Sequence, residues 1–134
     1  AGLLIGCYLH SIDSQIIGFA VCDNEAYFKY KIRSEIDTWF QAQRFVVPTK
    51  LPGIKVIDKY RGPRYGACVP EVYDLIKAVA RLEGIILDPI YTGKAFYGML
   101  KEIERGRFDS LSDIVFIHTG GLFGLFAHNS SNSI

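Results

Sequence analysis

The hydrophobic and polar positions of this chain change period several times, and the first part predicts a helix, a strand and a second helix. Residues 2–10 are apolar on nearly all sides of a helix. Residues 15–22 (QIIGFAVC) form a short apolar run between polar flanks, which favours a buried strand. Asp23 or Asn24 can cap the helix that follows. Its apolar positions recur every four residues on one face: Phe28, Ile32, Ile36 and Phe40.

The middle of the chain repeats this order of strand and helix. Residues 54–60 (IKVIDKY) alternate between apolar and polar positions like a strand. Residues 61–69 predict a loop, after which Pro70 suits the first turn of a helix and Gly84 suits its end. Residues 85–87 predict a further brief strand.

The last third predicts one more helix and one more strand. Residues 93–104 carry apolar side chains on one side of a helix, and residues 114–118 (IVFIH) are apolar like a strand. The glycine pair 120–121 then leads into a short apolar helix that ends near Ala127. The final residues, 129–134, are typical of a disordered tail.

Strands that alternate with helices predict an α/β fold, with a parallel sheet in an open sandwich. The 134 residues fit one domain, and an apolar fraction of 49% supplies a core and excludes a disordered chain. A βαβ unit begins with a strand, whereas this chain begins with a helix. Either Ala1 is a mature N-terminus left by removal of Met, or the chain begins within a domain.

Charge and cysteine content exclude several classes of protein. The net charge is +1, so we expect no nucleic-acid partner. The local basic cluster is interpreted as a solvated strand and loop: Lys55, Lys59, Arg61 and Arg64. Three cysteines without a CxxC pair favour a reducing, cytoplasmic compartment and argue against a metal site. Since no apolar run reaches the ~18–20 residues of a membrane helix, we expect no membrane partner.

Candidate chemistry gathers where strands end, because ligands of open parallel sheets bind outside the carboxyl ends of the strands. Three segments follow predicted strands: 64–66 with Tyr65, 88–94 with Tyr91, and 118–121. Both phenols could instead be half-buried packing residues. The residues alone therefore indicate an α/β domain with a candidate site at the strand ends.

Other residues in these segments also have two interpretations. Thr92 can cap the helix it precedes, and Gly120-Gly121 can serve only to turn the chain. Lys94 lies in the first turn of a helix, where a cation opposes the helix dipole. This hints at an anionic partner, although Lys is also common at such positions without one. No phosphate-loop pattern is complete, because Gly93-Lys94 is followed by Ala95 rather than Ser or Thr.

Longer strings carry a resemblance to a known family. The strings are DPIYTGKAFYGML (88–100), FIHTGG (116–121), AGLLIG (1–6) and GPRYG (62–66). With them, residues 1–128 resemble the C-terminal part of the large domain in the D-cysteine desulfhydrase and 1-aminocyclopropane-1-carboxylate (ACC) deaminase family. These enzymes use pyridoxal 5′-phosphate (PLP) and have the tryptophan-synthase-β-like fold, fold type II.

The resemblance implies roles for particular residues. Tyr91 matches the tyrosine that stacks on the cofactor ring, and Tyr65 matches a second catalytic tyrosine near the substrate. Thr119 matches a hydroxyl near the pyridine nitrogen, where a neutral group makes the ring a weaker electron sink than a carboxylate would. Thr92 and Gly120 are the remaining residues expected at the cofactor.

The same resemblance separates two branches of the family. ACC deaminases are similar to this pattern but carry Glu after the stacking tyrosine and Leu before the glycine pair. Thr92 and Thr119 stand at these positions here and favour the desulfhydrase branch. The implied reaction converts D-cysteine, a small amino-acid substrate, to pyruvate, sulfide and ammonia, with ACC deaminase as the alternative.

Two departures from the family pattern shape the expectations for this chain. Arg64 stands where the family usually has Gly. The family is also considerably longer, and its Schiff-base lysine and phosphate-binding loop lie in the N-terminal part. We therefore expect a homodimeric enzyme in the full-length form and an inactive isolated chain. An alternative of another class is a truncated form that acts as a binding or dimerisation partner.

Overall fold

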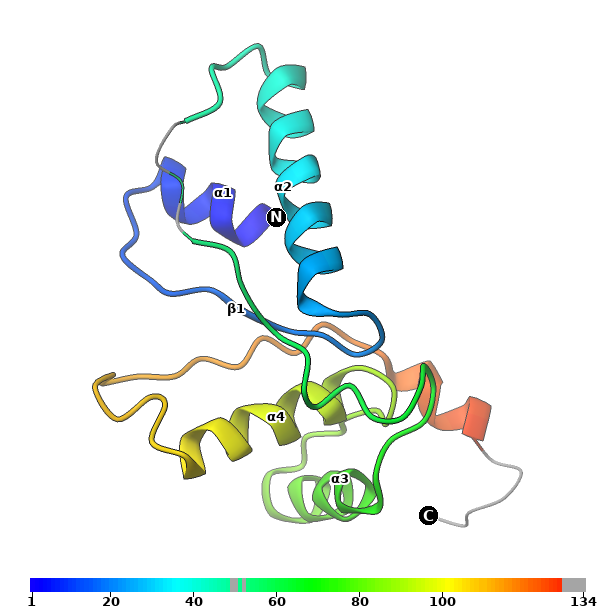
Figure 1. Ribbon diagram of the computed structural model, residues 1–134. Helices are drawn as coiled ribbons and strands as arrows, with labels where there is room; N and C mark the ends of the chain where they lie inside the picture. Colours follow the sequence, from blue (N-terminus) through cyan, green and yellow to red (C-terminus); the bar gives the residue numbers. More distant parts are fainter. Residues whose placement is uncertain (49–50, 52, 129–134) are drawn as a thin grey trace.

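The computed structural model describes residues 1–48, 51 and 53–128 and has helices on both sides of two short strands (Figure 1). In chain order, the elements are α1 (Gly2–Leu9), β1 (Ile17–Phe19), α2 (Glu25–Ala42), β2 (Lys55–Ile57), α3 (Pro70–Glu83), α4 (Thr92–Glu104) and the 3₁₀ helix η1 (Leu122–His128). This arrangement confirms the predicted α/β class. Among the described residues, no helix is both long enough and apolar enough to cross a membrane.

The strands β1 and β2 pair in parallel, as predicted. Ile17 lies opposite Lys55, and Phe19 lies opposite Ile57. Helix α2 connects them, as expected of a parallel crossover. Both strands are shorter than the predicted runs 15–22 and 54–60.

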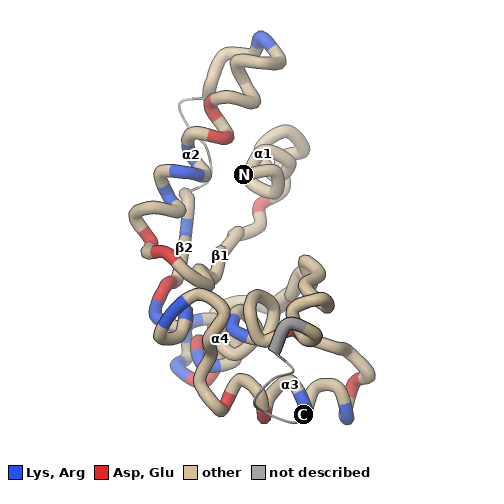
Figure 2. The backbone as a smooth tube through the Cα atoms, turned by 90° about the vertical axis from the view of Figure 1, so that its right-hand side faces the viewer, with Lys and Arg blue, Asp and Glu red and all other residues tan. Residues whose placement is uncertain are grey.

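One layer of the fold consists of α1 and α2. Its buried core is formed by Leu4, Ile5, Ile36 and Phe40. The capping prediction at the start of α2 is confirmed, since the Asn24 side chain accepts a hydrogen bond of 2.8 Å from the backbone N–H of Tyr27. Figure 2 shows that α1 carries no charged residue, whereas α2 carries both signs.

The other layer consists of α3 and α4. Its core is formed by Val72, Ile76, Val79 and Leu87. Pro70 begins α3, and Gly84 ends it in the left-handed conformation with φ 67°. The two helices approach closely at Gly93, where an added Cβ would lie 2.9 Å from the Ile76 side chain.

Two predicted strands, 85–87 and 114–118, are wrong, because neither segment is part of a sheet. A strand needs a neighbouring backbone to pair with. Here the Ile86 carbonyl oxygen lies 2.9 Å from the imidazole Nε2 of His118. The two segments are therefore joined by a side chain rather than by hydrogen bonds between their backbones. Leu87 and Phe116 still pack into the α3–α4 core, whereas Val115 is 83% exposed and Ile117 is 50% exposed.

The end of the described chain departs partly from prediction. The expected short helix is present as η1 and has 3₁₀ geometry. It follows Gly120 and Gly121, whose φ values are 97° and 100°, and the Gly124 N–H donates to the Gly121 carbonyl at 2.8 Å. The predicted tail, 129–134, lies outside the described residues.

Candidate functional site

Two tyrosine hydroxyls meet where the loop after β2 lies against the start of α4. Tyr91 directly precedes α4, and Tyr65 lies on the loop between β2 and α3. Their hydroxyl oxygens are 2.5 Å apart, and their ring centroids are 6.2 Å apart at 64°. The hydrogen bond with Tyr65 raises the pKa of Tyr91 above its usual value. The two phenols thus lie together, but only Tyr65 follows a strand, because the predicted strand 85–87 before Tyr91 is not formed.

Asp88 builds the turn that holds Tyr91. Its buried carboxylate accepts hydrogen bonds of 2.8 Å from the backbone N–H groups of Ile90, Tyr91 and Thr92. The first N–H groups of a helix have no partner within the helix, so a carboxylate at this position fixes both the turn and the start of α4. This capping role of Asp88 was not among the predictions from the sequence.

Thr92 lies beside Tyr91, but its hydroxyl is already engaged within the protein. The Thr92 Oγ1 donates to Asp88 Oδ1 at 2.6 Å and accepts from the Asp88 backbone N–H at 2.9 Å. The residue is 2% exposed. Its hydroxyl therefore stabilises the turn, and the N-cap position of α4 is occupied by Tyr91 rather than by Thr92.

The loop 118–121 turns back onto the same region. The His118 Nδ1 accepts a hydrogen bond of 3.1 Å from the Gly120 N–H, so the other ring nitrogen carries the proton and donates to the Ile86 carbonyl. Gly121 packs against the Asp88 carboxylate, where a Cβ would not fit. The glycine pair thus allows both the turn and the close approach.

A cavity of about 520 Å³ brings most of the predicted cofactor residues together. Tyr91, Thr92 and Thr119 line it. Tyr65 and Gly120 are not among the lining residues. Tyr65 is hydrogen-bonded to the lining residue Tyr91, and Gly120 directly follows the lining residue Thr119. The rest of the lining is largely apolar and includes Ile17, Phe19, Met99, Phe108 and Val115.

Some of the residues that line the cavity suit the flat ring of PLP. Cavities of this size hold small ligands, and the lining includes the aromatic ring of Tyr91, which is 40% exposed, and Thr119. Lys55 on β2 is the lysine among the described lining residues. Within the described residues, no group of three His, Cys, Asp or Glu side chains could hold a metal ion.

Lys94 is a site residue whose role the sequence did not reveal. It is 1% exposed, and its ammonium group donates to the carbonyl oxygens of Arg61 at 2.8 Å, Val21 at 3.3 Å and Arg64 at 3.4 Å. Burial lowers the pKa of this amine. The suggestion of an anionic partner at Lys94 is wrong, because its charge faces backbone carbonyls inside the protein.

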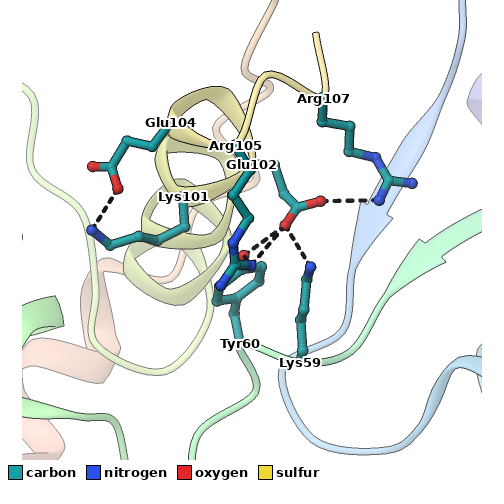
Figure 3. A network of polar contacts seen from close by, with 7 residues as sticks. All are labelled: Lys59, Tyr60, Lys101, Glu102, Glu104, Arg105 and Arg107. Atoms are coloured by element: carbon teal, nitrogen blue, oxygen red, sulfur yellow. Dashed lines mark hydrogen bonds and ion pairs between the residues drawn. The ribbon is translucent and has the colours of Figure 1, made fainter.

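A separate ionic network ties α4 to the end of β2 (Figure 3). The Glu102 carboxylate accepts hydrogen bonds from Tyr60 at 2.6 Å, Lys59 at 2.7 Å, Arg107 at 2.9 Å and Arg105 at 3.2 Å. Burial disfavours its charge, but these bonds outweigh burial and lower the Glu102 pKa to about 2. Burial and the bond to Glu102 raise the pKa of Tyr60 to about 12.

This network also shows how part of the predicted basic cluster is used. Lys59 pairs with Glu102, and the Arg61 guanidinium lies 3.9 Å from the Asp58 carboxylate. Arg64 has an exposed side chain, while its backbone carbonyl is held by Lys94. The structure thus adds two ion pairs to the interpretation of these residues as a solvated strand and loop.

Comparison with known proteins gives a consistent picture. A protein of Thermotoga maritima, named provisionally as an ACC deaminase, is 37% identical over 130 residues, which are 96% of this chain and 39% of that protein. The D-cysteine desulfhydrase of Yersinia pestis (strain Pestoides F) is 38% identical over 129 residues, 96% of this chain and 38% of that enzyme. No protein-family model matches the chain.

A solved structure supports the same relationship at the level of the fold. The crystal structure of an ACC deaminase homologue matches 92% of this chain with a TM-score of 0.79 and 34% sequence identity, and the match covers 36% of that structure. The chain thus spans less than two fifths of the length of these relatives. Over nearly its whole length it is homologous to the C-terminal part of proteins in the D-cysteine desulfhydrase and ACC deaminase family, as its motifs indicated.

Proposed function

We propose that this chain forms one wall of the active site in a PLP-dependent lyase that converts D-cysteine to pyruvate, sulfide and ammonia. The observation that carries the proposal is the hydrogen bond between Tyr65 and Tyr91, together with the cavity that both Tyr91 and Thr119 line. These three residues match the family positions for substrate, cofactor ring and pyridine nitrogen.

The geometry supports a proton-handling role for the two phenols. PLP, when bound, withdraws electrons from the α-carbon of an amino acid and so makes its proton acidic. The phenol of a tyrosine is protonated near neutral pH, and the hydrogen bond with Tyr65 raises the pKa of Tyr91 further. Tyr91 can therefore offer its ring face to the cofactor while the paired hydroxyls donate or pass on a proton.

The choice of D-cysteine rests on the two threonines. Thr119 places a small hydroxyl at a cavity position where ACC deaminases carry Leu, and Thr92 stands where they carry Glu. ACC deaminase is the second candidate, because the relatives of this chain carry both names.

We further propose that the Schiff-base lysine and the phosphate-binding loop come from family sequence that this chain does not span. The lysine nearest to Tyr91 along the chain, Lys94, is fully engaged with carbonyl oxygens and is unsuited to the role. A homodimeric full-length form and a cytoplasmic location remain predictions. A non-catalytic dimerisation partner remains the alternative of another class, supported by the exposed Leu3 and Leu9 on α1.

Two chimeras test the proposed function. In each, residues 1–128 replace the matching segment of a relative, once in the Yersinia pestis desulfhydrase and once in the Thermotoga maritima protein. We expect both to bind PLP and to release pyruvate from D-cysteine in preference to ammonia from ACC. If both chimeras bind PLP but turn over only ACC or neither substrate, the D-cysteine assignment is refuted.

A further inference from the structure

We infer that Lys94 is a positioning residue, which holds the backbone of the Tyr65 loop against α4 and thereby sets the Tyr65 hydroxyl on that of Tyr91. The inference rests on the proposed function, since that function assigns the tyrosine pair a role in proton transfer. It assigns a role to a buried cation whose ammonium group donates to backbone carbonyl oxygens.

The hydrogen bonds of the ammonium group define this role. Its three N–H donors have three carbonyl partners, two of which, Arg61 and Arg64, bracket the turn that leads into Tyr65. The third partner, Val21, lies just beyond the end of β1. One side chain thus joins α4, the end of the first strand and the loop after the second strand.

The position of Lys94 along α4 couples this contact to the tyrosine pair. Lys94 is three residues after Tyr91, about one helical turn, so both project from the first turn of the same helix. Arg64, whose carbonyl Lys94 holds, directly precedes Tyr65. A shift of that carbonyl would therefore move Tyr65 relative to Tyr91.

The loop needs an anchor of this kind, because little of it is buried. The Tyr65 side chain is 56% exposed. Within the loop, Gly62 and Gly66 adopt φ values of 77° and 75°, and the Ala67 N–H donates to the Arg64 carbonyl at 3.2 Å. These contacts shape the turn but do not tie it to α4.

The three carbonyl partners of Lys94 also explain why a charged ammonium group is tolerated in this buried position. Burying a charge is costly unless hydrogen bonds compensate for the lost water. Carbonyl oxygens compensate without neutralising the charge, and they fix the position of backbone segments rather than of mobile side chains. Because the hydrogen bonds reach three segments, their loss should loosen the least buried of these, the Tyr65 loop.

The rate of trypsin cleavage measures directly how firmly this loop is held. Two of the carbonyls that accept hydrogen bonds from Lys94 belong to peptide bonds that trypsin cleaves, Arg61–Gly62 and Arg64–Tyr65. The purified chain is compared with Lys94→Met, which removes the charge, and with Lys94→Gln, which retains an amide donor. Lys101→Met is the control, because Lys101 lies on the same helix with an exposed side chain. Cleavage after Lys31 and Arg33 in α2 reports on general unfolding.

We expect Lys94→Met to speed cleavage after Arg61 and Arg64 about tenfold, with no change at the α2 sites, and Lys94→Gln to have a smaller effect. In NMR titrations of ring-labelled tyrosine, the Tyr91 pKa should fall towards its usual value as Tyr65 moves away. Unchanged cleavage and titration would overturn the inference. An equal rise at the loop and α2 sites in both variants would also overturn it, because Lys94 would then support only general stability.

These measurements need neither cofactor nor substrate, so they separate this inference from the proposed function. If Lys94→Met loosens the loop selectively but leaves D-cysteine turnover by the chimeras unchanged, the catalytic role of the tyrosine pair is refuted. The positioning role of Lys94 would then still stand as a property of the fold.

Discussion

The hydroxyl of Thr92 and the carboxylate of Asp88 share a buried hydrogen bond of 2.6 Å. Thr92 stands at one of the two positions that distinguish the family branches, so a residue expected at the cofactor is also part of the turn that holds Tyr91. Changes at Thr92 therefore affect both the fold and substrate choice, whereas changes at Thr119 can be interpreted more simply.

Replacing Thr92 by Glu should destabilise the chain. The longer carboxylate would lie beside Asp88 in a buried site and would remove the hydroxyl that Asp88 binds, at a cost of about 2–4 kcal/mol. Urea unfolding at neutral pH measures this loss. Thr92→Ser, which keeps the hydroxyl, serves as the control and should lose much less. Equal stability of the Glu variant and the parent chain would contradict the structural role of Thr92.

Replacing Thr119 by Leu should change substrate preference with little effect on stability, because Thr119 lies on an exposed loop at the cavity. In the chimeras, we expect the ratio of kcat/KM for D-cysteine to kcat/KM for ACC to fall roughly tenfold, the range typical of an altered apolar contact. Paired assays of pyruvate and ammonia release measure the ratio. If the ratio stays constant, Thr119 does not determine substrate preference and no longer supports D-cysteine over ACC.

Glu102 should make the chain sensitive to acid. Its folded-state pKa of about 2 lies below the usual carboxyl value, so its ionised form stabilises the fold at neutral pH and this contribution is lost as pH falls from about 4.5 towards 2. The contribution is on the order of 3 kcal/mol. Urea unfolding of the parent chain, Glu102→Gln and the exposed control Glu104→Gln should be compared at pH 6 and pH 3.

The Glu102→Gln variant should be less stable at pH 6 but should lose less stability on acidification than the parent. Glu104→Gln should retain the parent's acid sensitivity, because Glu104 is 61% exposed and pairs only with Lys101 among the described residues. If Glu102→Gln loses as much stability as the parent between the two pH values, Glu102 is not the source of the effect.

The isolated chain should self-associate. Helix α1 has no charged residue and exposes Leu3 at 52% and Leu9 at 47%, and such clustered apolar surface drives association. Sedimentation velocity should show species larger than a monomer. Lys at both Leu3 and Leu9 should shift the distribution towards monomer, whereas Leu82→Lys on α3 should not. A parent chain that sediments as a single monomer would contradict this prediction.

Local sequence signals predicted the helices well. The Asn24 cap, Pro70 at the start of α3 and Gly84 at its end each act within a few residues of themselves, so the chain alone specifies them. The strand predictions for residues 85–87 and 114–118 failed, because local signals alone do not specify a strand. Apolar composition indicates that a segment can be buried, but a strand exists only where a second backbone pairs with it.

The candidate site shows the same limit. The rule that ligands bind at the carboxyl ends of strands directed attention to Tyr65 and Tyr91, and the two phenols do meet. Tyr91 nevertheless follows no strand, since residues 85–87 pair with no other backbone in the part of the chain that the structure describes. The role of Lys94 depends on carbonyls 30, 33 and 73 residues away along the chain, and neither residue type nor spacing signals such a contact. The capping role of Asp88 was not predicted, because its four accepted hydrogen bonds arise only in the folded turn.

The most direct test of this account is the effect of Tyr65→Phe on D-cysteine turnover by the Yersinia pestis chimera, with Tyr27→Phe on the surface of α2 as the control. If the Tyr65–Tyr91 pair handles the proton, kcat should fall about 100-fold or more, with unchanged PLP binding and a KM within a few-fold of the parent value. Tyr27→Phe should retain full activity. A Tyr65→Phe chimera that keeps the parent kcat would contradict the central claim.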